Sequence, residues 1–376
     1  MRNYVMTFFL IGLCCIPNSK AQESPFQAAL AAQFDGYFTE DAPGGVFLIQ
    51  QKGETVFLKS YGLADMDTKV KLDENSILNT GSISKTFVAN GILILAEEGK
   101  LRLEDPISNY FDDFEYPEII QDITIKHLLS NSSGLPDLRK VSEDPAFYMT
   151  AKDTANFEPI KGVTALNFMA GAKFQYSNPA YNGLALIIEK VSGQKWQDFV
   201  AERIFIPAGM TGSTITDGAH PQTGVAHAYE ARKGGYLESD YGETPTFAAA
   251  GNGGVWSSVL ELAKYETALQ QHVFLGEESL RASRTVYRDA NWSASAQPFV
   301  GYGWFLGETS LLGRNAELGV DVVYHTGSQG GFRSFFISIP EKELVYVALF
   351  NRPVPEMRKM MRTGLELLKA HDWLAD

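Results

Sequence analysis

The chain contains only two cysteines, Cys14 and Cys15, and both lie within its first 24 residues. Beyond that segment no thiol is available, which excludes a disulfide framework, a thiol nucleophile and a cysteine-ligated metal site. Basic residues are also in the minority, with 32 Lys and Arg against 45 Asp and Glu and a formal net charge of −13. Such an acidic chain repels phosphate backbones, so we expect no nucleic-acid partner and no attraction to anionic membranes.

Several motifs of other enzyme classes are missing. The histidines form neither H-x-x-x-H nor H-E-x-x-H, so we expect no metal site. His127 near the start of a short helix is interpreted as structural, and His220, His227, His272 and His371 are scattered. The absence of G-x-S-x-G argues against the α/β-hydrolase fold, and no phosphate-cradling G-x-x-x-x-G-K-[ST] occurs. We therefore expect neither a metal nor an organic cofactor.

The N-terminal stretch MRNYVMTFFLIGLCCIPNSKAQES has a basic start, an apolar run over 4–16 and small residues near its end. This layout predicts a secretory signal peptide, residues 1–21, cleaved after Ala21. The run is short for an uncleaved membrane anchor, and the bulky Leu13 before Cys14 fits a lipidation site poorly. We therefore expect an exported protein, periplasmic or secreted, with no stable membrane insertion after cleavage.

The remaining pattern places strands at both ends of a helical middle. Paired strands are predicted over 44–65 with a turn at Lys52-Gly53, and further strands over 321–340 and 343–353. Helices are predicted after Ser82 to about Gly99, within 122–137 after a Thr124 cap, and over 178–193, 195–210 and 356–374. The simplest packing is an α/β (α+β) fold in which terminal strands form one antiparallel sheet, flanked by the first and last helices.

We accordingly expect residues 22–376 to form a single catalytic domain of two lobes. The α/β lobe would comprise about 24–100 and 300–376, and a mainly helical lobe about 101–299. With 376 residues, 45% of them hydrophobic, the chain is long enough for a sizeable core.

The S-x-x-K motif occurs twice, at Ser82–Lys85 and at Ser192–Lys195. The second follows a predicted helix end, where Ser-Gly is ordinary turn chemistry. The first lies where a glycine-containing loop meets a helix start, so unpaired N–H groups and the helix dipole favour developing negative charge. Residues i and i+3 share a helix face, so the Ser82 hydroxyl and the Lys85 amine are predicted to meet as nucleophile and base partner.

Two further segments supply candidate partners. Tyr176-Ser177-Asn178 pairs a phenol that can shuttle a proton with an amide that can donate to a substrate carbonyl, although a packed tyrosine and an Asn-Pro turn would look the same. In the strand pattern of His325-Thr326-Gly327-Ser328, His325 and Gly327 project to one side, and the glycine lets a ligand approach the backbone. The alternative is a bulge in an edge strand.

Together these stretches resemble the serine hydrolase family of class C β-lactamases, penicillin-binding DD-peptidases and related family VIII-type esterases. The resemblance is carried by GSISKTF, TIKHLLSNSSGLP, FQYSNPAYNGL, AAGNGGVWSS and HTGSQGGF, which occur in the family's order and cover nearly all of the mature chain.

The resemblance implies an acylated nucleophile at Ser82 with Lys85 as its base partner and Tyr176 as proton shuttle. It also implies substrate contacts at Asn178, His325, Gly327 and Ser328, with the backbone N–H groups of Ser82 and Ser328 as oxyanion hole. Whether Lys85 or Tyr176 removes the proton stays open, because the two titrate as a coupled pair.

One residue departs from the class C pattern. Those enzymes usually carry lysine at the position of His325, and an imidazole is largely neutral at pH 7. We therefore expect cleavage of a D-residue peptide or small ester through an acyl-serine. The alternatives are a class C type β-lactamase and a penicillin-binding or sensor protein without turnover. Arg333, further along the same run, could supply a contact for a substrate carboxylate, but we interpret it as a surface arginine on a strand.

Overall fold

The computed structural model describes residues 24–139, 141, 143–144, 147, 150–215, 224–238, 248, 250–288, 300–307 and 318–375. The predicted signal peptide and His220 lie outside the described residues. Within the described part of the chain, no helix is both long and apolar enough to cross a membrane.

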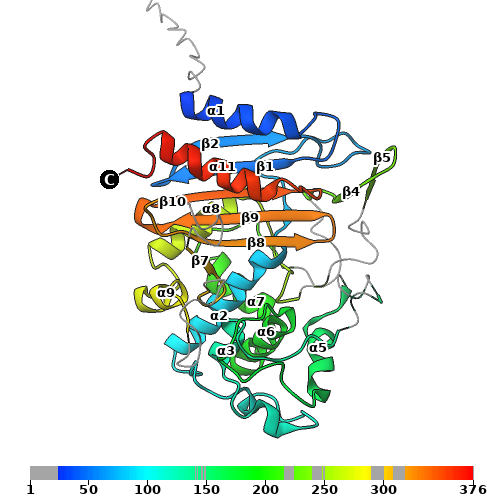
Figure 1. Ribbon diagram of the computed structural model, residues 1–376, viewed down its shortest axis with the longest axis vertical. Coiled ribbons are helices and arrows are strands. Elements are labelled where there is room, and N and C mark those ends of the chain that lie inside the picture. Colours follow the sequence, from blue (N-terminus) through cyan, green and yellow to red (C-terminus); the bar gives the residue numbers. More distant parts are fainter. Residues whose placement is uncertain are drawn as a thin grey trace, which may run out of the picture.

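One antiparallel sheet of six strands is the centre of the molecule (Figure 1). Its order is β2-β1-β10-β9-β8-β7, and its strands are β1 Gly45–Gln51, β2 Glu54–Tyr61, β7 Phe305–Leu306, β8 Val323–Gln329, β9 Phe332–Ile339 and β10 Leu344–Phe350. β1 pairs with β10 in a register that sets Leu48 opposite Val347. The prediction of a sheet built from both chain ends is therefore confirmed.

The first hairpin turns where the sequence predicted. Lys52 and Gly53 adopt positive φ angles of 51° and 79°. Two consecutive residues in this region are what a two-residue hairpin turn requires, because such a turn matches the twist of the flanking strands. The turn carries β1 into β2, with Gln51 opposite Glu54.

Helices α1 Pro25–Phe34 and α11 Met357–Ala370 pack against each other and cover one face of the sheet (Figure 1). The Phe34 ring stacks on Phe47 of β1 at 4.5 Å between centroids. Helix α1 was not predicted, although Ser24 caps it, Pro25 begins it and Gln27 completes a capping box. The prediction for α11 is confirmed.

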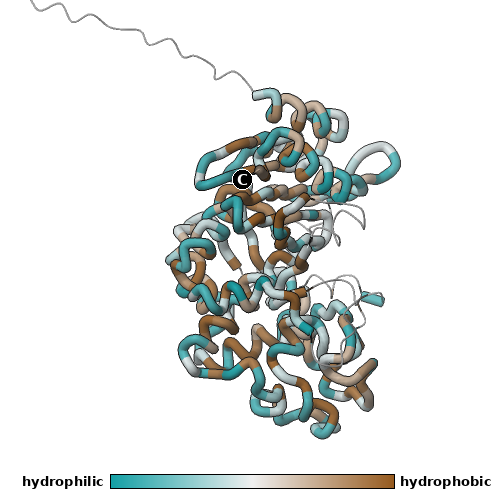
Figure 2. The backbone as a smooth tube through the Cα atoms, turned by 60° about the vertical axis from the view of Figure 1, so that its left-hand side comes forward, coloured by the Kyte–Doolittle hydropathy of each residue, from teal (hydrophilic) through white to brown (hydrophobic). Residues whose placement is uncertain are grey.

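The other face of the sheet continues into the helical part of the molecule. These helices are α2 Ser84–Glu97, α3 Ile125–Leu129, α5 Asp153–Phe157, α6 Asn178–Ser192, α7 Trp196–Val200, α8 Val259–Gln270 and α9 Glu277–Ser283. One hydrophobic core joins Phe87 of α2 and Leu184 of α6 to Leu48 and Val347 of the sheet. Figure 2 shows hydrophobic stretches along the central strands, whereas the outer loops are largely hydrophilic.

Helix ends follow local sequence signals. Thr124 caps α3 together with His127, and Gly193 in the left-handed region ends α6. The predicted helix 195–210 is shorter, because α7 passes into a π-helical turn Ala201–Phe205. Two small sheets complete the fold, one of β3 Leu78–Asn79 with β6 Trp256–Ser257 and one of β4 Tyr229–Arg232 with β5 Gly235–Glu238.

The expected division into lobes is not strict. Helix α8, which lies in the range 101–299 expected for the helical lobe, packs against β1 and β10 of the sheet. Helix α2, from the range expected for the α/β lobe, packs against α6 and α7. Both helices contribute side chains to the one hydrophobic core that also contains Leu48 and Val347 of the sheet and Leu184 of α6. The single-domain boundary 22–376 stays a prediction.

Candidate active site

Ser82 lies in a short 3₁₀ turn, Gly81–Ile83, that leads directly into α2. The turn is fixed to β6 because Leu78 pairs with Ser257 and Asn79 with Trp256. Ser84 Oγ also accepts a hydrogen bond from the Val255 N–H at 3.0 Å. These contacts bring the glycine-rich loop before β6 against the start of α2, next to the turn that carries Ser82.

Lys85 is fully buried in the first turn of α2. Its Nζ lies 3.0 Å from Ser82 Oγ and donates to the Asn252 carbonyl oxygen at 2.6 Å. Burial, and then the charge of Arg139, hold the Lys85 pKa well below its ordinary value. A neutral amine at this distance can accept the Ser82 hydroxyl proton, which is the chemistry that the sequence predicted for this pair.

Tyr176, just before α6, faces the same amine. Lys85 Nζ lies 5.2 Å from the centre of the Tyr176 ring and 5.7 Å from that of Tyr181. Tyr181 is fully buried and donates to the Leu129 carbonyl at 2.7 Å, whereas 37% of Tyr176 is exposed. Burial raises the Tyr181 pKa well above its ordinary value. Of these two phenols, Tyr176 is therefore the one that a substrate can reach.

His325, on β8, lies next to Tyr176 and completes the group of side chains around Lys85. Its ring lies 6.4 Å from that of Tyr176 and 5.3 Å from that of Phe305, centroid to centroid. Burial, followed by the Lys85 charge, lowers the His325 pKa to about 3. The imidazole is thus neutral at pH 7, and its Nδ1 lies 2.7 Å from the Thr326 carbonyl oxygen, to which it donates. The three distant segments that the sequence singled out converge here.

Gly327 and Ser328 contact the turn that holds the nucleophile. A Cβ atom on Gly327 would lie 2.1 Å from the Thr80 carbonyl oxygen, and one on Gly81 would lie 2.5 Å from Ser328 N. A side chain at position 327 would therefore collide with the Thr80 carbonyl, which is a packing reason for this glycine in addition to the predicted ligand approach. Ser328 N lies beside Gly81, as an oxyanion hole shared with Ser82 requires.

Asn178, the first residue of α6, has its side-chain oxygen buried without a hydrogen-bond partner among the described residues. A buried acceptor in this state is costly unless a bound group supplies a donor. The unpaired atom is the acceptor oxygen, whereas the sequence predicted donation from the Asn178 amide to a substrate carbonyl, so this observation does not test that contact. The roles of all seven candidate residues, catalytic and substrate-binding, stay predictions.

The second S-x-x-K match, His127 and Arg333 each make hydrogen bonds within turns, helix caps or strands. Ser192 Oγ accepts from the Gln194 N–H at 3.1 Å in the turn that follows α6, where Gly193 has a φ of 74°. His127 Nδ1 accepts from the Thr124 N–H at 3.1 Å and caps α3. Arg333, on β9, is half-buried and donates to the Gly330 and Phe332 carbonyls.

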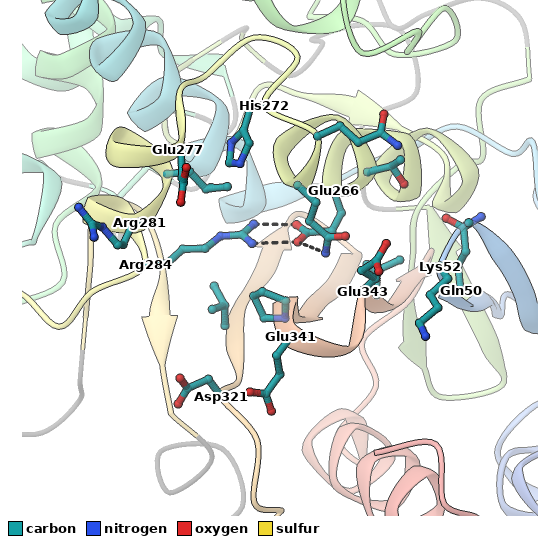
Figure 3. Close-up of a pocket in the computed structure, with 18 of the residues that line it drawn as sticks. Gln50, Lys52, Glu266, His272, Glu277, Arg281, Arg284, Asp321, Glu341 and Glu343 are labelled. Carbon is teal, nitrogen blue, oxygen red and sulfur yellow. Dashed lines mark hydrogen bonds and ion pairs between the residues drawn. The ribbon is translucent and has the colours of Figure 1, made fainter. Parts of the chain in front are cut away.

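A cavity of about 670 Å³ lies away from Ser82, between α8, α9 and the sheet (Figure 3). Arg284 and Glu266, which line it, form a bidentate ion pair at 2.7 and 2.9 Å. None of the candidate catalytic or substrate-binding residues lines this cavity. Its size does not make it the reactive site, because the nucleophile and its base partner lie elsewhere.

The sequence did not single out the carbonyl of Asn252, although it lies in the AAGNGGVWSS stretch. A backbone acceptor has no residue signature, so only the fold reveals it. Among the described residues no group of three or more His, Cys, Asp and Glu is arranged to hold a metal ion.

A family model described as "Beta-lactamase" matches residues 26–370. Penicillin-binding protein 4* of Bacillus subtilis (strain 168) is 29% identical over 321 residues, covering 82% of this chain and 68% of that protein. Protein flp of Staphylococcus aureus (strain COL) is 26% identical over 353 residues, covering 89% of this chain and 65% of that protein. The chain thus spans about two thirds of the length of these curated relatives.

Solved structures agree. The octameric penicillin-binding protein homologue from Pyrococcus abyssi superposes with a TM-score of 0.73 at 26% identity, over 91% of this chain and 76% of that one. D-amino acid amidase from Ochrobactrum anthropi SV3, complexed with L-phenylalanine amide, gives 0.75 at 20% identity over 93% and 99%, a likeness of fold alone. Because the family model spans most of its length, the chain belongs to the β-lactamase family, whose members are serine hydrolases.

Proposed function

We propose that this protein cleaves an ester or amide bond through an acyl intermediate on Ser82, and that its substrate is a D-residue peptide or a small ester. The observation that carries the proposal is the 3.0 Å contact between Ser82 Oγ and the amine of the fully buried Lys85. Burying a lysine costs stability, but burial also lowers its pKa and favours the neutral amine, which can act as a base.

The reaction follows from these positions. The Ser82 proton passes to the Lys85 amine or to an ionised Tyr176, and Oγ bonds to the substrate carbonyl carbon. The N–H groups of Ser82 and Ser328 stabilise the oxyanion. As the tetrahedral intermediate collapses, the scissile bond breaks and Tyr176 passes a proton to the leaving amine or alcohol. Water then attacks the acyl-serine, releasing the carboxylic acid and restoring the Ser82 hydroxyl.

His325 bears on the class of substrate that the site can accept. A neutral imidazole offers no fixed cation to the carboxylate of a β-lactam, so peptide or ester cleavage ranks above antibiotic hydrolysis. Two relatives are named a penicillin-binding protein or its homologue, so penicillin is one of the probes in the test. The alternatives, a class C type β-lactamase and a binding or sensor protein without turnover, remain outcomes of the test.

The test is a parallel screen of p-nitrophenyl esters, D-alanyl peptides and a chromogenic cephalosporin, with intact-mass analysis after reaction with a fluorophosphonate and with penicillin. We expect turnover of a peptide or ester and one adduct on the wild type. Ser82→Ala should lose the adduct and about 10⁴-fold or more of kcat. Ser192→Ala, in the other S-x-x-K match, is the control and should behave as the wild type.

Three results would change the assignment. An equal adduct on Ser82→Ala, or none on the wild type, rejects the proposal. Fast cephalosporin turnover would establish the β-lactamase alternative. A stable stoichiometric adduct without product release would establish the sensor.

We also propose that the protein is exported and that residues 1–21 are removed. The support is the order of basic, apolar and small residues at the N-terminus. N-terminal sequencing of protein recovered outside the cytoplasm should begin at Gln22. A cytoplasmic protein that retains the full N-terminus would contradict export.

A further inference from the structure

A chain of buried polar side chains leads from α5 to the carbonyl that holds Lys85. The Asn182 side-chain amide, on α6, donates to Asp153 Oδ1 at 2.7 Å and to Asn252 Oδ1 at 2.9 Å. The Gly251 N–H donates to the same Asp153 oxygen at 2.8 Å. Asn252 in turn presents its backbone carbonyl to Lys85 Nζ. Helices α5 and α6 lie side by side (Figure 1).

All members of this chain are out of solvent. Asn182 has no exposed surface, and Asp153 and Asn252 are each 6% exposed. Burial raises the Asp153 pKa to about 7, although hydrogen bonds from Asn182 and Gly251 oppose the rise. Burying a carboxyl group in the core costs free energy of folding that burying an apolar residue would not. The presence of Asp153 here therefore points to a role beyond packing.

These hydrogen bonds restrain a glycine-rich segment of the backbone, residues 251–254. Asn252 stands in the run Gly251-Asn252-Gly253-Gly254, and glycine-rich backbone has many accessible conformations. Asp153 fixes the peptide N–H on one side of Asn252, and Asn182 fixes its side chain. The Asn252 carbonyl and Ser82 Oγ are the two hydrogen-bond partners of the Lys85 amine. The position of that carbonyl therefore sets the position of the amine.

We propose that Asp153, Asn182 and Asn252 form a buried brace whose function is to position the Lys85 amine against Ser82. Asp153 and Asn182 are positioning residues, because neither contacts the reacting atoms. Asn252 contacts the Lys85 amine only through its backbone carbonyl, and its side chain takes part in the brace. The inference rests on the proposed function, in which Lys85 is the base partner of Ser82.

The first test uses the hydrogen bonds from Asn182 and Gly251 to Asp153, which share one oxygen; the Trp196 side chain also donates to this carboxyl group. Asp153→Asn keeps an oxygen that can accept both, whereas Asp153→Ala removes it. We expect Asp153→Ala to lower kcat and the rate of Ser82 phosphonylation by about 10- to 100-fold with KM within about threefold, because small misplacements of a catalytic group cost that much. Asp153→Asn should recover most of that loss.

A matched pair of asparagines separates positioning from stability. Asn90, on the same helix as Lys85, is also fully buried, and its amide donates to Tyr265 Oη at 2.6 Å. Tyr265 in turn donates to the Thr86 hydroxyl and not to the Lys85 amine or its carbonyl acceptor. Asn182→Ala and Asn90→Ala each remove one buried amide and should lower Tm comparably. Only Asn182→Ala should lower kcat. If the two variants lose kcat equally, or if folded Asp153→Ala keeps kcat within twofold, the brace is rejected.

Amide hydrogen exchange tests, without any measurement of turnover, whether Asp153 restrains the segment around Asn252. In Asp153→Ala the amides of residues 250–255 should exchange faster than in the wild type, because the Gly251 N–H has lost its acceptor. In Asn90→Ala they should not. Unchanged exchange in Asp153→Ala overturns the brace. A wild type that reacts with no substrate or probe overturns the proposed function instead, and exchange still decides the brace.

Discussion

Two buried cations in this molecule have opposite surroundings. Arg284, 6% exposed at its side chain, meets the Glu266 carboxylate, which is 2% exposed, in a bidentate pair. Glu266 also accepts from Ser338 at 2.5 Å and from Gln270 at 2.9 Å. Lys85, with no exposed surface, hydrogen-bonds to two uncharged oxygens, those of Ser82 and Asn252.

The different partners of Arg284 and Lys85 distinguish a structural ion pair from a basic group with the proposed catalytic role. Arginine keeps its proton in proteins, so its burial requires a carboxylate partner, and Arg284 has one. Lysine can lose its proton when buried, and the lowered Lys85 pKa favours that form. The cavity beside Arg284 is roomy, yet the Arg284 charge is neutralised there by Glu266. The proposed reactive position is the one of these two at which no carboxylate pairs with the basic group.

Removing the Lys85 amine should give the largest effect. Lys85→Met keeps most of the side-chain volume, so we expect Tm to stay level or rise while kcat falls about 10²- to 10⁴-fold, the usual worth of a positioned base. Thermal unfolding and turnover of the same preparation measure both. A variant that loses stability but keeps kcat would place Lys85 with Arg284 among structural charges.

Removing Arg284 should give the reverse result. Arg284→Met leaves Glu266 buried without its partner, which should cost about 3–5 kcal/mol of unfolding free energy. Below the new Tm, kcat per folded molecule should equal that of the wild type. Denaturant unfolding measures the loss. Arg284→Met combined with Glu266→Leu should recover much of it, and a loss of kcat without a loss of stability would contradict the structural role.

The smallest effect should appear in the pH dependence of stability. The His325 pKa is about 3 in the folded protein and ordinarily 6.5, so the unfolded chain binds the proton more strongly. Stability from this residue is complete above pH 6.5 and is lost as pH falls toward 3, by about 2 kcal/mol between pH 6.5 and 5.

His325→Gln should therefore lose less stability than the wild type over that interval. His272→Gln, at an exposed position, should keep the wild-type dependence. Because both variants keep Asp153, its titration cancels in the comparison. Parallel pH curves for wild type and His325→Gln would show that the imidazole titrates alike in the folded and unfolded protein.

Local signals in the sequence predicted much of the fold. Alternating apolar residues and the Lys52-Gly53 turn gave the first hairpin, and helical spacing after Ser82 gave α2. Spacing and order of the motifs gave the three segments that meet at Lys85. Helix α1 was missed, because the capping signal of Ser24 and Gln27 is only two residues long.

What the sequence could not predict depends on contacts between distant backbone atoms. The acceptor for Lys85 is a peptide carbonyl, and any residue at position 252 has one. The carboxyl of Asp153 lies far from any motif, and its two hydrogen bonds exist only after α5 and α6 pack. Gly327 was noticed, but its neighbour, the Thr80 carbonyl, became visible only in the folded chain.

The order of the chain has a consequence for when this protein becomes active during synthesis. The sheet begins with β1 and is completed through its pairing with β10, about three hundred residues later. Strand β8 packs against the turn that carries Ser82 and supplies His325 and Ser328. A nascent chain that has released α2 and α6 but not yet residues 323–350 therefore carries its nucleophile without the strand that completes the site. Reactivity should appear only after residues 323–350 have been synthesised.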